Sequence, residues 1–120
     1  MNARIKTIAN LEMAPRLKVL CLRRNLISRI EGLESLTVLE ELDLYDNKIQ
    51  EIQNLSHFQH LRILDLSFNL IKQIQNLDQL VSLKKLYLIS NKIRKIENLE
   101  SLVSLEMLEL GSNKLRVLFT

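Results

Sequence analysis

The chain repeats itself every 22 residues, and this period constrains its fold more than any other feature. An asparagine recurs at this interval, and each one is preceded at fixed distances by three leucines. The asparagines are Asn25, Asn47, Asn69, Asn91 and Asn113. The leucines are Leu17, Leu20 and Leu22; Leu39, Leu42 and Leu44; Leu61, Leu64 and Leu66; Leu83, Leu86 and Leu88; and Leu105, Leu108 and Leu110. One unit of this size cannot bury its own leucines, so the units must stack and share a continuous core.

Two apolar spacings within each unit predict its local structure. The alternating leucines at the end of each set favour a short strand, because side chains two residues apart share one face of a strand. Apolar residues spaced by three follow each asparagine, as at Ile27, Ile30, Leu33 and Leu36, and this spacing suits a tight 3₁₀ or helical return. The pattern L-x-x-L-x-L-x-x-N is the signature of leucine-rich repeats. We therefore predict an α/β leucine-rich repeat solenoid with short parallel strands on its concave face and 3₁₀ or helical return segments on its convex face.

The repeats account for nearly the whole chain. Residues 1–16 are predicted to be a partial N-terminal repeat, and residues 17–120 about five repeats, the last of them truncated. Neither end carries a recognisable polar cap, and solenoids need polar terminal repeats to stay soluble. The sequence therefore predicts either a fragment of a longer array or self-association through the uncapped ends.

Two asparagine registers have structural explanations. An amide side chain can both donate and accept hydrogen bonds, so the five recurrent asparagines are interpreted as a ladder that links one turn to the next. A second register contains only Gly or Asn, at Asn10, Gly32, Asn54, Asn76 and Asn98. Both residue types tolerate a positive φ and can cap a helix, which predicts a turn into the return segment at this position.

Composition and isolated motifs argue against several kinds of function. A net charge of +3 allows only a mild attraction to acidic surfaces. The single cysteine, Cys21, cannot form an internal disulfide and favours a reducing compartment. No apolar run is long enough for a membrane span. His57 and His60 have no recurring third ligand, and Cys21 has no evident base. Asp43 and Asp65 have the separation of a catalytic carboxylate pair, but any two equivalent residues of neighbouring repeats have this separation, so it does not indicate a hydrolase. We therefore predict no enzyme activity, no metal and no cofactor.

The variable positions of the strands form the predicted binding site, because they project onto one face. The candidate partner-binding residues are Asp43, Tyr45, Asp65, Phe68, Tyr87, Ile89 and Glu109. Asp43 and Asp65 are expected on neighbouring strands about 4.8 Å apart, so their charges repel each other. A basic partner would relieve this repulsion, although Arg62, Lys85 or solvent could also do so. Exposed aromatic and apolar groups beside the acids are typical of the centre of a protein interface.

A basic rim follows the ladder asparagines and leaves a second kind of partner open. It consists of Lys48, Lys72, Lys92, Arg94, Lys95, Lys114 and Arg116. The rim lacks the interleaved aromatic residues on which bases stack, so a solvated edge is favoured over a weak nucleic-acid site.

The exposed strand residues resemble those of one family of leucine-rich repeat proteins. Leu42, Asp43, Leu44, Tyr45, Asp46 and Asn47, and the corresponding residues 20–25, 64–69 and 108–113, closely resemble the leucine-rich-repeat regulatory subunit of protein phosphatase 1, known as regulatory subunit 7. The resemblance implies a nuclear and cytoplasmic protein that binds the phosphatase catalytic subunit on its concave face. Asp65, Tyr87 and Glu109 match the binding positions of the family, and Asp43 occupies the same register one repeat earlier. The family has more repeats and a C-terminal cap. A structural adaptor for an axonemal or spliceosomal complex is the alternative, because those proteins share the 22-residue period.

Overall fold

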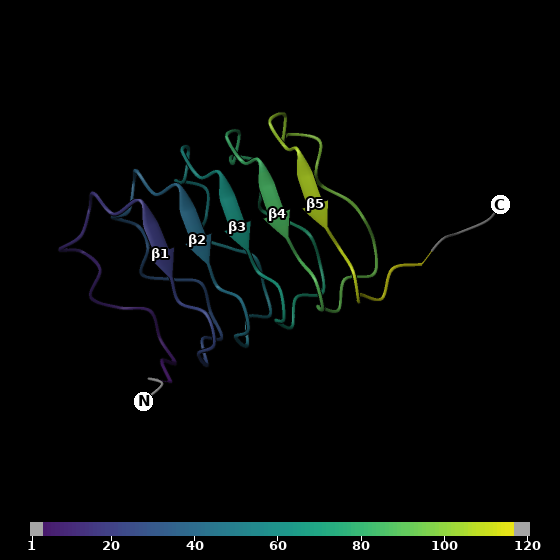
Figure 1. The fold of residues 1–120 in the computed structure, drawn as a ribbon, viewed down its shortest axis with the longest axis horizontal. Coiled ribbons are helices and arrows are strands. Elements are labelled where there is room, and N and C mark those ends of the chain that lie inside the picture. The colour runs from purple at the N-terminus through teal and green to yellow at the C-terminus, as the bar shows by residue number, and fades with distance from the viewer. Residues whose placement is uncertain (1–3, 117–120) are drawn as a thin grey trace.

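Five three-residue strands, one per repeat, form the sheet in the computed structural model, which describes residues 4–116. They are β1 (Val19–Cys21), β2 (Glu41–Asp43), β3 (Ile63–Asp65), β4 (Lys85–Tyr87) and β5 (Met107–Glu109). All pairs are parallel and the sheet order is the chain order (Figure 1). The predicted parallel strands are therefore confirmed, and equivalent residues of successive repeats are direct neighbours.

The middle residue of each strand points into the core. Leu42, Leu64 and Leu86 are at most 1% exposed, while the residues on either side of them are partly exposed. The isoleucines and leucines of the return segments fill the space behind the sheet, together with Phe58, which is fully buried. Burying one such side chain contributes about 2 kcal/mol. The core is therefore one continuous column in which each repeat depends on its neighbours.

The predicted 3₁₀ or helical return segments are wrong, and with them the α part of the predicted class. The described residues contain strands and turns but no helix. In the return that follows Gly32, Leu36 N–H donates to the Leu33 carbonyl at 3.1 Å and Leu39 N–H to the Leu36 carbonyl at 3.3 Å. Only every third N–H makes this bond, whereas a 3₁₀-helix bonds successive residues. An apolar spacing of three residues is compatible with a series of turns as well as with a 3₁₀-helix, so periodicity alone could not distinguish these two structures.

Side chains from the next repeat bind carbonyls that the turns leave available. The Leu33 carbonyl oxygen lies 2.8 Å from a ring nitrogen of His57. Asn54 Nδ2 donates to the Ile30 carbonyl at 2.7 Å, and Asn76 and Asn98 repeat this bond one and two repeats later. These bonds explain how a return without a helix meets the demand of its backbone for hydrogen bonds.

The Gly or Asn register has a positive φ throughout, at 65° in Asn10, 73° in Gly32, 60° in Asn54, 58° in Asn76 and 59° in Asn98. None of these residues caps a helix, since no helix follows. Gly32 has an additional constraint, because a Cβ at this position would lie 2.6 Å from the carbonyl oxygen of Ile8. The positive φ admits either residue type, so lack of space for a Cβ is what restricts this turn to glycine.

The five ladder asparagines join consecutive repeats from inside. Asn69 Nδ2 donates to the carbonyls of Leu44, Leu66 and Ser67 at 3.0, 3.1 and 3.1 Å, and its Oδ1 accepts the Ile49 N–H at 3.0 Å. Asn47, Asn91 and Asn113 make the same set of bonds, and Asn25 Oδ1 accepts from Ile5. One side-chain amide thus hydrogen-bonds backbone groups of two repeats, which are buried away from water.

The apolar side chains of the last described repeat are more exposed to solvent than those of the other repeats. Ile96 is 57% exposed, whereas its equivalents Ile30, Ile52 and Ile74 are fully buried. Self-association through the ends stays a prediction. Within residues 4–116 there is no helix that could cross a membrane.

Replacing Asn69 with alanine should lower the free energy of unfolding by about 3 kcal/mol, because buried carbonyl and amide groups would lose their partner. Asn113→Ala is the matched control. Asn113 makes the same bonds but is only half-buried, so water can replace it and the loss should be about 1 kcal/mol. Urea unfolding measures both losses. Equal losses would contradict the role of burial.

Gly32→Ala should destabilise the chain by about 1 to 3 kcal/mol, because alanine is strained at a positive φ and its Cβ would press against Ile8. Gly111→Ala provides the comparison, since no atom lies within 4 Å of a Cβ at that position. Thermal unfolding should show a clear fall in Tm for the first variant and almost none for the second.

Candidate functional site

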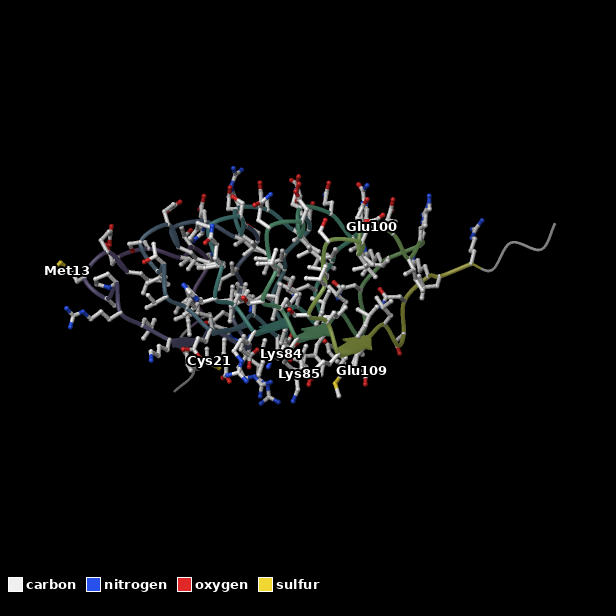
Figure 2. All side chains as sticks on the ribbon, turned by 90° about the horizontal axis from the view of Figure 1, so that it is seen from above. Met13, Cys21, Lys84, Lys85, Glu100 and Glu109 are labelled. Carbon is white, nitrogen blue, oxygen red and sulfur yellow. The ribbon has the colours of Figure 1, made fainter. Side chains whose placement is uncertain are left out.

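The exposed side of the sheet, which we call the sheet face, carries two rows of side chains. The first row contains the third residue of each strand: Cys21, Asp43, Asp65, Tyr87 and Glu109. The second contains the first residue of each strand: Val19, Glu41, Ile63, Lys85 and Met107. Figure 2 shows Cys21, Lys85 and Glu109 on the sheet side of the molecule and Glu100 on the opposite side. The sheet thus brings four of the predicted partner-binding residues, Asp43, Asp65, Tyr87 and Glu109, into one row.

The remaining three predicted residues lie just beyond the ends of the strands. Tyr45 and Ile89 are half-buried and Phe68 is 45% exposed. The rings of Tyr45 and Phe68 are 5.1 Å apart and inclined by 50°. They therefore extend the acidic row with an aromatic pair that joins two repeats.

Arg23 neutralises Asp43 from within the chain. Its Nε lies 3.0 Å from Asp43 Oδ2, and its guanidinium carbon lies 4.7 Å from the centre of the Tyr45 ring. The Cys21 thiol lies 3.7 Å from the same Asp43 oxygen, and Asp43 Oδ1 accepts the Tyr45 N–H at 3.0 Å. From the sequence, Arg62 or Lys85 was expected to neutralise the charges of Asp43 and Asp65, and Arg23 was not. Arg23 lies one repeat before Tyr45 in the sequence, and this spacing could have indicated that it lies beside Tyr45 and Asp43.

Asp65 has a different environment, although it lies beside Asp43 in the sheet. Among the ion pairs of residues 4–116, none includes Asp65. Its Oδ1 accepts the Ser67 N–H at 2.9 Å. Burial raises the pKa of the Asp65 carboxyl, and the nearby Asp43 charge adds to this, while the hydrogen bonds from Ser67 and the charge of Arg23 oppose it. The result is a half-buried carboxylate without a matching cation.

Ser67 is a second residue that the sequence analysis missed. Its side chain is 2% exposed, and its Oγ accepts the Ile89 N–H at 3.0 Å. Ser67 therefore fixes the backbone of the next repeat while its own N–H holds Asp65. A serine in one variable position gave no sequence signal for either contact.

The residue before each ladder asparagine adopts a left-handed conformation, with φ between 55° and 60° at Arg24, Asp46, Phe68, Ser90 and Ser112. A bond to the next repeat holds this conformation in place, as where Phe68 N–H donates to the Ile89 carbonyl at 2.7 Å. Such a conformation is unfavourable for a bulky aromatic residue. Four of the five repeats place a polar residue there, so the fold does not require Phe68.

The residues considered for catalysis lie apart from one another. His57 is half-buried, with its ring centre 3.9 Å from that of Phe58 and the two rings inclined by 43°, and His60 is exposed. No group of three metal-binding side chains occurs in the part of the chain that the structure describes. Cys21 is an exposed free thiol.

Comparisons with known proteins give a consistent result. A family model described as Leucine Rich repeats (2 copies) matches residues 15–57 and 37–79. The fold is similar to that of the internalin inlF from Listeria monocytogenes, with a TM-score of 0.87, 27% identity and coverage of 95% of this chain and 34% of the internalin. No curated protein sequence is significantly similar to the chain.

Two further solved structures extend this comparison. A leucine-rich repeat protein of Leptospira interrogans gives a TM-score of 0.82 at 29% identity, covering 88% of this chain and 28% of that protein. The leucine-rich repeat ectodomain of the receptor kinase SOBIR1 from Arabidopsis thaliana gives 0.68 at 32% identity, with coverage of 88% and 62%. The chain therefore spans less than two thirds of each of these structures.

Asp65→Asn should stabilise the folded chain at pH 7. The pKa of Asp65 lies above its ordinary value of 3.8 in the folded state, so the folded chain holds this proton more tightly than the unfolded chain. The stability gained from that proton is fully present below the ordinary value and is lost as the pH rises through the folded pKa. The asparagine can still accept the Ser67 N–H bond, so its advantage should be present at pH 7 and should vanish near pH 3.

Asp43→Asn is the control for this prediction, because it removes the neighbouring carboxylate that Arg23 already pairs. It should give no gain in stability at pH 7. Urea unfolding of the parent and both variants across this pH range measures the difference. A stabilised Asp43→Asn, or an Asp65→Asn advantage that does not change with pH, would contradict the assignment to Asp65.

Proposed function

The chain belongs to the leucine-rich repeat proteins, and we propose that it is a non-catalytic scaffold whose sheet face docks the catalytic subunit of protein phosphatase 1. Leucine-rich repeat scaffolds are typical of protein–protein interaction. The observation that carries the proposal is the half-buried Asp65 carboxylate, which has no ion pair among the described residues and lies between Asp43 and Tyr87 in the sheet.

A basic side chain of a partner would fit this position. It would neutralise Asp65, relieve the repulsion from Asp43 and pack against the ring of Tyr87, whose face attracts cations. Asp65 already occupies a defined geometry, because the Ser67 N–H holds one of its oxygens. The partner would then lose little free energy in ordering the acceptor.

The aromatic pair gives independent support to a docking face. Phe68 is 45% exposed in a left-handed conformation that costs about 1 kcal/mol or more for such a residue. The fold obtains little in return for this cost, since the equivalent residues in the other repeats are polar. A large exposed aromatic residue next to Tyr45 and Arg23 is the composition expected of the centre of an interface.

The resemblance of the exposed strand residues to regulatory subunit 7 of protein phosphatase 1 supplies the partner. Asp65, Tyr87 and Glu109 occupy one row of the sheet, in the register that this resemblance assigns to the phosphatase. The proposal includes a nuclear and cytoplasmic location. A structural adaptor would use the same face for a different protein, and binding to the phosphatase separates the two.

Calorimetric titration of the chain with the protein phosphatase 1 catalytic subunit should detect binding. The double variant Asp65→Ala, Tyr87→Ala should weaken it by about a hundredfold, since paired central residues of an interface contribute at least 2 kcal/mol. Asp78→Ala, Glu100→Ala is the control, because both residues are exposed and neither belongs to a strand of the sheet. It should bind like the parent.

No binding by a folded parent would overturn the phosphatase as partner of this chain. Equal losses in the two double variants would overturn the sheet face as the binding surface. Circular dichroism of each variant, compared with the parent, establishes that the fold is retained.

A further inference from the structure

A groove of about 500 Å³ runs along the edge of the sheet where the strands begin. Its wall contains the residue immediately before each of the first four strands, namely Lys18, Glu40, Arg62 and Lys84. Lys84 lies on the sheet side of the molecule beside Lys85 (Figure 2). The groove borders the sheet face but contains none of the residues proposed above to dock a phosphatase.

The backbone fixes the spacing of this row. The Lys18 carbonyl accepts N–H bonds from Glu40 and Glu41 at 2.8 and 3.0 Å. The Glu40 and Arg62 carbonyls accept the equivalent pairs of bonds one and two repeats later. The Cα positions of the row are therefore held at the strand spacing of about 4.8 Å, and the groove exists before any ligand arrives.

Positive charge accumulates at one end of the groove. Glu40 lies 3.8 Å from Lys18 Nζ and 3.6 Å from Arg62 Nη1, so one carboxylate serves two cations. Arg62 is left with Nε and Nη2 as further donors. Lys84 takes part in none of the ion pairs among residues 4–116, and neither does Glu106, the next residue of the row. Arg62 and Lys84 thus present adjacent cationic donors to solvent.

The other wall adds polar and apolar groups. His60 and Ser82 line it in the repeats of Arg62 and Lys84, and Val38 contributes an apolar side chain that is 36% exposed in the repeat of Glu40. Ser82 Oγ donates to the Gln59 carbonyl at 2.8 Å, which fixes the position of this hydroxyl. A ligand in the groove would therefore meet Arg62 and Lys84 at one end and the apolar side chain of Val38 in the repeat before them.

We propose that this groove binds an extended acidic peptide, with its carboxylates against Arg62 and Lys84. The distance along the row from Lys18 to Lys84 is three strand spacings, about 14 Å, which an extended peptide covers with about four residues. A peptide can place an uncharged residue against Glu40 and an apolar one against Val38. A nucleic-acid backbone carries a charge at every phosphate and would be repelled by Glu40.

Fluorescence anisotropy tests the proposal with a labelled peptide of six residues, four of them glutamate, and a matched peptide with glutamine in their place. The chain should bind the glutamate peptide and not the glutamine peptide. Arg62→Ala, Lys84→Ala should weaken binding at least about tenfold, because two charge-assisted contacts are lost. Lys48→Ala, Lys92→Ala removes the same charge from the basic rim and should leave the affinity within about twofold.

Several results would overturn the proposal. They are the absence of peptide binding, an equal loss in the rim variant, and tighter binding of a labelled oligouridylate than of the peptide. Displacement of the peptide by inorganic phosphate at millimolar concentration would also overturn it, because it would reduce the site to a simple anion site. The variant Asp65→Ala, Tyr87→Ala should bind the peptide like the parent, so the groove and the phosphatase-docking face succeed or fail separately.

Discussion

The structure depends on one demand, that backbone groups turned inward after each strand must find hydrogen-bond partners away from water. The ladder asparagines meet it: the amides of Asn47, Asn69, Asn91 and Asn113 each donate to carbonyls of two repeats and accept one N–H of the preceding repeat. A leucine core could slide between registers, because apolar contacts have no direction. The amide bonds are directional, so they fix each repeat against the next by one full period. Parallel strands of only three residues can then pair in register along the whole described chain.

Because the strand register is fixed, equivalent residues of successive repeats line up in rows on the surface. Residues that are 22 apart become direct neighbours, so the composition of any one position in the repeat becomes the composition of a row across the molecule. The row Cys21, Asp43, Asp65, Tyr87 and Glu109 is acidic and aromatic, whereas the row Lys18, Glu40, Arg62 and Lys84 at the edge of the sheet is mainly basic. These rows are separated by a few residues along each repeat, so the same scaffold offers two surfaces of opposite charge.

The features that point to function are those that the fold does not require. Asp65 is half-buried with an elevated pKa and without an ion pair among the described residues, although its neighbour Asp43 is paired with Arg23. Phe68 is exposed in a conformation that polar residues occupy in the other repeats. Arg62 and Lys84 present adjacent cationic donors to solvent. Each of these lowers stability or leaves it unchanged, and each would be improved by a partner, which is the expected behaviour of a binding surface.

The sequence by itself determined the period, the position of every strand, the members of the core and the residues that share each row, because these follow from the spacing of leucines and asparagines. It also indicated the turn at Gly32 and Asn54, where only residues that tolerate a positive φ occur. The tertiary structure decided the rest. The returns are chained turns and not helices, and side chains of the next repeat, such as His57, bind carbonyls that the turns leave available. Arg23 and not Arg62 pairs with Asp43, because a long side chain can reach several neighbours at similar sequence distances. Ser67 holds Asp65 through its backbone N–H, because the local conformation of the chain after β3 brings this N–H within bonding distance. Periodicity places residues on a face, but only the packed structure determines which atoms come within bonding distance.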